Sequence, residues 1–393
     1  MSEDLTTFRD RVRQWLAQNA RPRATGTSFA VAPYDSAALA RAADDGRAWQ
    51  KRVHEGGFAG LDWPVEYGGQ GMSKRAAAIF HEEERAYDVS RQIVTISLNM
   101  ASRVLMAHGS DEQKAYHLPR ILDGRSVWCQ MFSEPDAGSD LFSLKTKAIL
   151  EGDRFRVNGR KIWISIADRA EYGMLLARSD PAQSRHKGLS FIIVPMNLPG
   201  ITVRPIRQAT GAPEFCEVFL DDVLVPATNL LGTLHGGAQV AFTLLQAERE
   251  MLGTGMALND RPGLVELIET ARRRGHLSDA RVRGQIGQAC VRERMLQALW
   301  EQNSGALLDG TASESLAVIL KLLSATHLAK TVQTGLELAG AVPNRAAGDE
   351  VGSYWQYHYL HAWAERFGGG TEQIQKNTLA QQALKLPRPP RAG

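Results

Sequence analysis

The chain has 393 residues, 44% hydrophobic and 23% charged, which is typical of a soluble globular protein with more than one domain. Its formal net charge is only +3, and its arginines are scattered without interleaved aromatic residues, so nucleic-acid binding is not expected. Three cysteines, Cys129, Cys216 and Cys290, lie far apart without a CxxC motif, which favours a reducing compartment. The N-terminus has no apolar signal core, and no run of about 18 apolar residues follows, so we predict a cytoplasmic protein without a membrane span.

The first part of the chain, residues 1–125, is predicted to be an all-α domain. Phe8, Val12, Trp15 and Leu16 recur at helical spacing near its start. The Pro/Gly-rich segment 21–34 and the turn-rich GGFAGLDWPVEYGGQG interrupt the helical pattern and are expected to be loops. The further helices expected in this domain cover residues 36–56, 73–87, 90–108 and Asp111–Leu118, and the last of them ends at Pro119.

The character of the sequence changes near residue 126, and residues 126–232 are predicted to form a β domain that resembles a sandwich or barrel. The segment KTKAILEGDRFRVNGRKIWIS alternates with a period of two and contains turn signals at Gly152–Asp153 and Asn158–Gly159. Four more short segments follow, each rich in β-branched or aromatic residues and bounded by turn formers: YGMLLARS, GLSFIIVP, ITVRPIR and CEVFLDDVLVP.

Helical periodicity returns in residues 233–393, which are predicted to form a C-terminal four-helix bundle. The expected helices cover 238–273, 279–308, 312–340 and 350–366, and a last helix begins near Thr371. Because helices and strands come in blocks and do not alternate, the predicted class is α+β multidomain, not a doubly wound parallel sheet. No GxGxxG motif follows a strand and opens a helix, so a Rossmann dinucleotide site is not supported.

Five motifs follow one another along the chain: LDWPVEYGGQG (61–71), HGSDEQKAYHLPRILDG (108–124), WCQMFSEPDAGSD (128–140), NGRKIWIS (158–165) and GGTEQIQKN (369–377). Together with the order of the domains, they resemble the acyl-CoA dehydrogenase family over nearly the whole chain. The third motif contains the family's EPxAGSD core, and the fourth is similar to its NGxKxWIT. The resemblance implies an FAD enzyme that converts an acyl-CoA to a trans-2-enoyl-CoA. It also implies an electron-transfer flavoprotein as partner and a homo-oligomer, either a tetramer or a dimer.

Dehydrogenation across the α and β carbons of a thioester places definite demands on the protein. The α-proton is weakly acidic, so its removal needs a positioned carboxylate and donors that stabilise the charge developing on the thioester oxygen. The β-hydrogen leaves as a hydride to a flat acceptor, for which the protein supplies orientation and a dry site. Candidate residues are therefore carboxylates, hydrogen-bond donors and rigid aromatic side chains.

The resemblance implies that seven residues of these motifs contact FAD: Phe132, Ser133, Trp163, Ile164, Ser165, Thr371 and Gln373. In the family, the tryptophan covers the isoalloxazine ring, and the hydroxyl residue matching Ser165 lies at N5. The Phe132–Ser133 backbone matches the pyrimidine edge of the ring, and Ser139 matches a residue at the CoA arm. Two alternatives are open, because Trp163 also fits a sandwich core and Thr371 also fits an ordinary N-cap.

The catalytic base is where this chain departs from the commonest family pattern. Many members carry a glutamate at the position of Gly369, but members of the isovaleryl and long-chain type carry it in a Glu-Arg pair on a helix. LLQAERE contains that pair, so Glu248 is predicted to be the base, in a partly desolvated setting that raises its pKa. Arg249 is expected to hold Glu248 or the CoA pyrophosphate. The Gly369 N–H would bind the thioester carbonyl beside Gly370 in the substrate site.

Other features of the sequence leave alternatives to this assignment. The family's R-x-x-F-G is not obvious in residues 272–284, and the Gly-rich loop near residue 340 is reduced, so no inter-subunit FAD contact is assigned. A non-catalytic or FAD-completing subunit of a heteromer, and a flavin monooxygenase on the same fold, are therefore the rival hypotheses. No metal site is predicted, because the sequence around His358 and His361 offers no carboxylate that would complete one. The acyl group is not readable, although helix-borne bases accompany branched, long or bulky acyl groups in the family.

Overall fold

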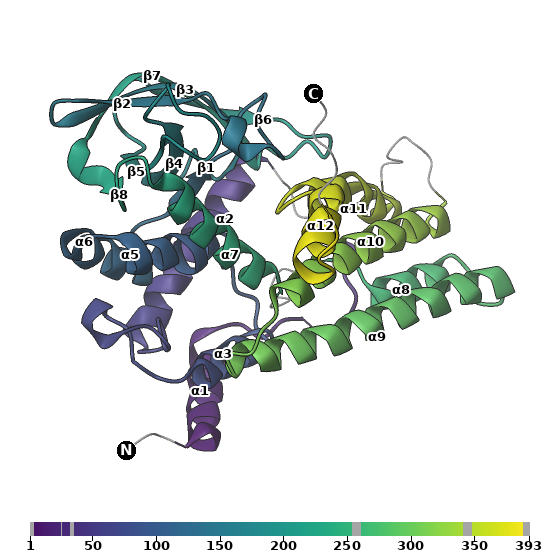
Figure 1. Cartoon of the computed structure of the whole chain (residues 1–393). Coiled ribbons are helices and arrows are strands. Elements are labelled where there is room, and N and C mark those ends of the chain that lie inside the picture. The colour runs from purple at the N-terminus through teal and green to yellow at the C-terminus, as the bar shows by residue number, and fades with distance from the viewer. Residues whose placement is uncertain (1–3, 25, 32–34, 254–260, 341–347, 388–393) are drawn as a thin grey trace. The chain divides into compact units, whose positions relative to one another are not determined.

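A computed structural model describes residues 4–24, 26–31, 35–253, 261–340 and 348–387 (Figure 1). The chain forms two compact units. The first consists of Met1–Ala24 and Tyr34–Ala247, and the second of Thr25–Pro33 and Glu248–Gly393. The predicted block order of helices, then strands, then helices is confirmed. The division into three domains with boundaries at residues 125 and 232 stays a prediction.

The helices at the start of the first unit begin at polar N-caps, such as Asp4, Asp35 and Ser73, and pack around buried aromatic side chains. Their bounds are α1 Leu5–Asn19, α2 Ser36–Glu55, α3 Lys74–Glu84, α4 Gln92–Ile96, a π-helical turn at Ser97–Ala101, α5 Ser102–His108 and α6 Asp111–Leu122. A short 3-10 turn, Val65–Tyr67, lies in the segment expected to be a loop.

The predicted end of α6 at Leu118 is wrong, because this helix continues through Pro119 to Leu122. A proline inside a helix removes a hydrogen bond and costs about 3 kcal/mol. Ile121 and Leu122 are fully buried, and burying each such side chain is worth about 1.5–3 kcal/mol. The apolar contacts of the last helical turn therefore offset the cost of the proline.

A buried carboxylate, Glu84, ties α3 to its neighbours. It accepts a hydrogen bond from the Trp49 indole at 2.7 Å and pairs with Arg91 at 2.7 Å. Burial alone would raise the pKa of Glu84, but Arg91 and hydrogen bonds from His81 and Trp49 lower it to about 2. Because the folded pKa lies below the unfolded value, Glu84 stabilises the fold above that value, and this contribution is lost as the pH falls toward 2.

We therefore expect Glu84→Gln to lower the free energy of unfolding by about 1–3 kcal/mol at neutral pH. The difference from wild type should shrink as the pH falls below the ordinary pKa of a glutamate, because the unfolded wild-type chain then takes up a proton at Glu84 that the folded protein, with a pKa of about 2, does not bind. Urea unfolding at about pH 7 and about pH 4 measures both effects, with the exposed Glu82→Gln as control. A difference that does not depend on pH would show that the charge of Glu84 does not contribute.

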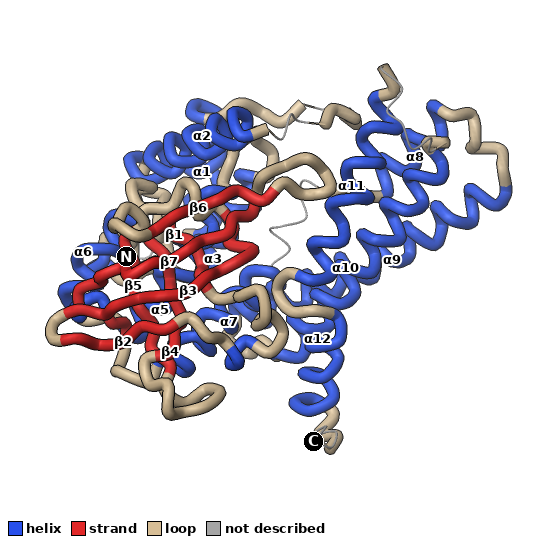
Figure 2. The backbone as a smooth tube through the Cα atoms, turned by 90° about the horizontal axis from the view of Figure 1, so that it is seen from above, coloured by secondary structure: helices blue, strands red, loops and turns tan. Residues whose placement is uncertain are grey.

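The β domain is one eight-stranded mixed sheet, drawn in red in Figure 2. Its order is β6-β7-β3-β2-β4-β5-β8, and β1 pairs with β4 in parallel. The strands are β1 Trp128–Met131, β2 Lys147–Glu151, β3 Arg154–Ser165, β4 Tyr172–Arg178, β5 Leu189–Pro195, β6 Ile201–Ile206, β7 Phe215–Pro226 and β8 Leu230–Leu231. Short 3-10 turns occupy Leu141–Ser143 and Ala227–Asn229.

The sheet wraps around its own core, as the sandwich or barrel prediction required. β2 and β4 share a single residue pair, Lys147 with Arg178, so the sheet opens there into two halves. Fully buried side chains from both halves, among them Phe155 and Val218 from one and Leu175 and Ile192 from the other, form one apolar cluster. The predicted β class is therefore confirmed.

One of the two predicted turns in this domain is wrong. Gly152 lies in the turn between β2 and β3, as expected, but Asn158–Gly159 lies inside β3 at a register shift opposite β7. The Asn158 side chain donates to the Asp222 carboxylate at 3.0 Å and accepts from the Asp222 N–H at 2.9 Å. These cross-strand bonds hold Asn158 opposite a bulge in β7 at Asp221–Asp222, so the Asn-Gly pair continues β3 instead of forming a hairpin turn.

The second unit is helical, and its helices are long. α7 Gly237–Gly253 begins in the first unit, and α8 Leu264–Arg273, α9 Ala280–Leu308, α10 Glu314–Leu338, α11 Glu350–Phe367, α12 Glu372–Thr378 and a π-helical turn at Leu379–Ala383 follow. The single helix predicted over 238–273 is wrong. α8 begins after Pro262–Gly263, where the proline restricts the preceding residue and the Gly263 N–H bonds to Glu266 at 2.8 Å.

Helix α10 is long and apolar enough, over Ser315–Leu338, to cross a membrane by length and composition alone. Its apolar side chains Val318, Leu320, Leu328 and Val332 are buried inside the protein. Val332 and Leu328 belong to the same apolar cluster as Trp355 of α11, whose indole donates to Thr270 at 2.7 Å. The helix therefore packs as a core helix of the second unit.

Candidate functional site

Two of the predicted motifs meet in the first unit, where the end of β1 lies against the end of β3. The Ile162 N–H donates to the Ser133 carbonyl at 3.0 Å. We call the residues on the two sides of this contact, 132–134 and 161–165, the platform. It contains five residues predicted to contact FAD, namely Phe132, Ser133, Trp163, Ile164 and Ser165.

Trp163 has an unusual backbone and an exposed ring. Its φ is +62°, and the pairing of β3 with β7 shifts register between Lys161 and Ile164, so a bulge turns the indole outward. The residue is 56% exposed, with its ring edge-on to Phe215 at 6.2 Å. A left-handed φ is costly for a bulky residue and is found mainly at functional sites. The alternative of a core tryptophan is therefore wrong.

The other platform residues differ in what they can offer a ligand. The side chains of Phe132 and Ile164 are buried, at 4% and 2% exposure, so only their backbone can face outward. Ser133 and Ser165 are half-buried. The platform thus combines an exposed indole, two hydroxyl groups and backbone groups at strand ends, which suits a flat heteroaromatic ring with polar edges.

A fully buried lysine, which the sequence analysis did not assign, holds the platform together. The Lys161 ammonium donates to the Phe132 carbonyl, the Leu176 carbonyl and the Glu134 carboxylate, each at 2.9 Å. Glu134 also accepts the Lys145 and Thr146 N–H groups, at 2.6 and 2.9 Å. Every donor of the ammonium is thereby satisfied, which a buried charge requires.

The pair also shifts the titration of both groups. Burial lowers the pKa of Lys161 to about 8, and the Glu134 carboxylate opposes that shift. Burial alone would raise the pKa of Glu134, but the Lys161 ammonium and the hydrogen bonds it receives lower it overall. Lys161 and Glu134 both lie inside the motifs that carry the family resemblance, which is the signal that marks them.

The predicted contact of the CoA arm, Ser139, is exposed in the turn that follows Glu134. Beside this turn, Asp140 lies 3.7 Å from Arg185 in an exposed ion pair. Phe142 packs edge-on against Phe242 of α7 at 5.4 Å. Phe242 is itself 53% exposed.

The remaining predicted residues lie in the second unit. Glu248 and Arg249 are both half-buried on α7. Gly369 and Gly370 follow α11, with φ of +63° and +89°. Thr371 is the N-cap of α12 and accepts from the Ile374 N–H at 3.2 Å, so the N-cap interpretation holds whatever else Thr371 does. Gln373 is exposed on α12.

A second lysine, half-buried, lies within electrostatic reach of the predicted base. Lys321 of α10 donates to the Glu365 carbonyl at 2.5 Å. Burial lowers the pKa of Lys321, and the carboxylates of Glu365, Glu248 and Glu372 oppose that shift. The ammonium therefore interacts with the Glu248 carboxylate. The signal for Lys321 in the sequence is a lone lysine in the apolar run LAVILKLLSA.

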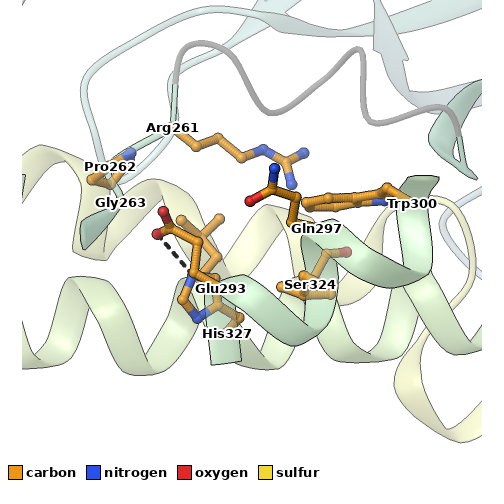
Figure 3. A pocket seen from close by; sticks show the side chains of 10 residues that line it. Arg261, Pro262, Gly263, Glu293, Gln297, Trp300, Ser324 and His327 are labelled. Atoms are coloured by element: carbon orange, nitrogen blue, oxygen red, sulfur yellow. Dashed lines mark ion pairs between the residues drawn. The ribbon is translucent and has the colours of Figure 1, made fainter. Parts of the chain in front are cut away.

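A pocket of about 280 Å³ lies between residues 261–263, which precede α8, and helices α9 and α10 (Figure 3). In it Glu293 and His327 form an ion pair at 3.7 Å, and the Arg261 guanidinium extends toward Gln297. Trp300, Ser324 and the apolar Leu296 and Leu328 complete the walls. None of the predicted site residues lines it, so this pocket is separate from the predicted site. Among the described residues, no group of three or more His, Cys, Asp or Glu is placed to hold a metal ion.

Three family models match successive parts of the chain. They are the acyl-CoA dehydrogenase N-terminal domain over residues 2–125, the middle domain over 129–223 and the C-terminal domain over 235–384. The chain therefore belongs to the acyl-CoA dehydrogenase family. It is an oxidoreductase, and both the family and the enzyme class predicted from the motifs are confirmed.

Individual relatives agree with this assignment. The chain is 34% identical to the acyl-CoA dehydrogenase IpdE1 of Mycobacterium tuberculosis, over 98% of this chain and 99% of that protein. It is 31% identical to the acyl-CoA dehydrogenase FadE29 of the same organism, over 88% and 89%. Among solved structures it is similar to the Tcur3481-Tcur3483 steroid ACAD, with a TM-score of 0.79 and 26% identity over 98% of each chain.

Proposed function

We propose that this acyl-CoA dehydrogenase uses FAD to convert an acyl-CoA to a trans-2-enoyl-CoA, with Glu248 as the base. The platform is the observation that supports a flavin site. Its indole is exposed on a strained left-handed backbone, which a bound ligand would explain. When bound there, FAD supplies the acceptor for the β-hydride. Trp163 would stack on its ring, and Ser133 and Ser165 would donate to its edges. Thr371 and Gln373 would hold the adenosine half.

The protein's own residues would carry the proton chemistry. Glu248 is half-buried and raises the pKa of the Lys321 ammonium electrostatically, so a partly desolvated carboxylate is available beside a cation. The Gly369 N–H would stabilise the charge on the thioester oxygen, since glycine keeps the backbone donor although it lacks a carboxylate. Arg249 would hold Glu248 or the CoA pyrophosphate, and Ser139 and Gly370 would contact the thioester arm. Electrons would pass to an electron-transfer flavoprotein.

The direct test is turnover by the purified full chain. We expect a yellow protein with about one FAD per chain that removes two hydrogens from at least one member of an acyl-CoA panel, with an artificial electron acceptor. The panel should include straight, branched, long and polycyclic acyl groups, because the similar solved structure is a steroid ACAD. Mass spectrometry of the thioester product detects the removal of the two hydrogens. A flavin-loaded protein that oxidises no member of such a panel would contradict the proposal.

A second candidate is a subunit of a heteromeric acyl-CoA dehydrogenase. The observation that favours it is the similar solved structure, whose name pairs two chains, Tcur3481 and Tcur3483. In that case the purified chain alone would be colourless and would bind FAD only with a homologous chain from the same genome. Native mass spectrometry of the chain alone and of the mixture separates a homotetramer or homodimer from a heteromer.

Trp163 provides a test of the platform that does not depend on turnover. We expect Trp163→Ala to weaken FAD binding about tenfold or more, because stacking of an aromatic side chain on a base-like ring is worth about 1–3 kcal/mol. The indole is exposed, so the stability of the FAD-free protein should change by no more than about 0.5 kcal/mol. Titration of the FAD-free protein measures the first effect and urea unfolding the second.

The matched control is Leu150→Ala, which removes another exposed apolar side chain from the same sheet. It should leave FAD affinity unchanged. Equal affinity of the Trp163→Ala variant and wild type would remove the platform from the flavin site.

A further inference from the structure

The turn between α11 and α12, residues 368–371, is built from three glycines and a threonine. We call it the glycine turn. The Gly368 N–H donates to the Ala364 carbonyl at 2.8 Å and ends α11. Gly369 and Gly370 then take left-handed φ values of +63° and +89°. A run of glycines has many alternative conformations, so a turn that must present one N–H in one direction needs external restraint.

A buried amide supplies that restraint. Gln375 is 5% exposed, and its Nε2 donates to the Gly369 carbonyl at 2.8 Å. A Cβ added at Gly370 would meet the same nitrogen at 2.6 Å, so the amide packs directly against the turn. The bond fixes the plane of the peptide between Gly369 and Gly370. Because the neighbouring peptide carries the Gly369 N–H, the bond also limits how far that N–H can rotate.

Ion pairs brace the two ends of the glycine turn. Arg366, in the last turn of α11, bonds to Glu372, in the first turn of α12, at 2.6 Å. The preceding Glu365 pairs with Arg261 at 2.8 Å. These contacts hold the helix ends on both sides, but only the Gln375 amide contacts the backbone of Gly369 among the side-chain bonds described for the turn.

We propose that Gln375 is a positioning residue for the dehydrogenation, because its amide fixes the glycine turn and so keeps the Gly369 N–H aimed at the thioester carbonyl. The inference rests on the proposed function, since it assigns that N–H to the thioester. Gln375 itself would contact neither substrate nor flavin and acts through Gly369. A hydrogen bond that strengthens as charge develops on the oxygen lowers the barrier more than it tightens binding. Losing its alignment should therefore lower kcat and leave KM nearly unchanged.

Two substitutions separate the hydrogen bond from the volume of the side chain. Gln375→Met keeps the size without a donor, and Gln375→Glu keeps the shape but presents an ionised acceptor to the Gly369 carbonyl. We expect both to lower kcat by about 10- to 100-fold, with KM within about threefold of wild type. The control is Gln382→Ala, an exposed glutamine in the π-helical turn that follows α12, which should match wild type.

A measurement without turnover completes the test. A 3-oxoacyl-CoA has an acidic α-carbon and forms an enolate on binding, which can be followed by absorbance across a pH series. The pKa of the bound analogue should rise by about one unit or more in both Gln375 variants, because a tenfold weaker stabilisation of the enolate corresponds to one unit. Thermal unfolding of each variant shows whether it is folded.

The positioning role of Gln375 and the proposed function are contradicted by different results. Folded Gln375→Glu and Gln375→Met proteins with wild-type kcat and wild-type analogue pKa would overturn the positioning role. So would a loss of kcat that is matched by a rise in KM and by a lower unfolding temperature, since that pattern reports damaged packing. A wild-type protein that oxidises no acyl-CoA and does not acidify the analogue would instead end the proposed function, and this inference with it.

Discussion

Substitution Glu248→Gln should lower kcat for acyl-CoA oxidation by at least about 10²-fold, because a positioned general base contributes about 10²–10⁴-fold to a proton transfer. Glutamine keeps the size and the hydrogen-bonding ability of the side chain but cannot take a proton. Flavin content and KM should stay close to wild type, because the carboxylate acts on the α-proton and not on the binding of FAD. Steady-state kinetics on the best substrate of the acyl-CoA panel measures the effect.

Glu250→Gln is the matched control, since Glu250 is an equally half-buried carboxylate two residues further along α7. It should retain most of the activity, because residues two apart do not share a helix face. If the Glu248→Gln protein is yellow and turns over at nearly the wild-type rate, another group removes the proton. The family assignment would survive that result, whereas the proposed mechanism would not.

The order of the fold could be predicted because each block of the sequence has its own periodicity. The errors came from residues whose role depends on distant contacts. Asn158–Gly159 has the composition of a hairpin turn, but Asn158 bonds to Asp222 in a bulge of β7, and the pair stays inside β3. Pro119 looks like a helix end, but the burial of Ile121 and Leu122 carries α6 past it. Local propensity gave way to tertiary contacts in both cases.

Some residues of the candidate site could likewise be predicted from the sequence, and others could not. Trp163 and Glu248 could be named from motifs, because those motifs pair a residue type with a reaction. The roles of Lys161 and Lys321 could not be predicted, although Lys161 lies inside one of those motifs, because a lysine in a strand or helix is usually exposed and its partners lie far away in sequence. Glu134 precedes Lys161 by 27 residues, and Glu365 follows Lys321 by 44. Only the packing of separate elements brings each ammonium to its acceptors.

The second large effect is expected when the buried Lys161–Glu134 pair is broken. Lys161→Met should lower the free energy of unfolding by about 3–5 kcal/mol, because it leaves the Glu134 carboxylate buried without its cation. It should also weaken FAD binding, because the Phe132 carbonyl at the edge of the platform loses its donor. Urea unfolding and FAD titration measure the two effects. Arg156→Met is the control, because Arg156 lies on the same strand as Lys161 but its ion pair with Glu151 of β2 is exposed, and such pairs are worth no more than about 1 kcal/mol.

A double substitution separates the two roles of this pair. Lys161→Met with Glu134→Gln removes both charges, so no carboxylate is left buried and unpaired, and most of the lost stability should return. FAD affinity should not return, because neither substitution restores the ammonium that donates to the Phe132 carbonyl. Recovery of stability and affinity together would mean that the pair supports only the fold of the β domain. Recovery of stability alone would show that the ammonium also sets the shape of the platform. The lysine of the NGRKIWIS motif would then serve the flavin site as well as the fold.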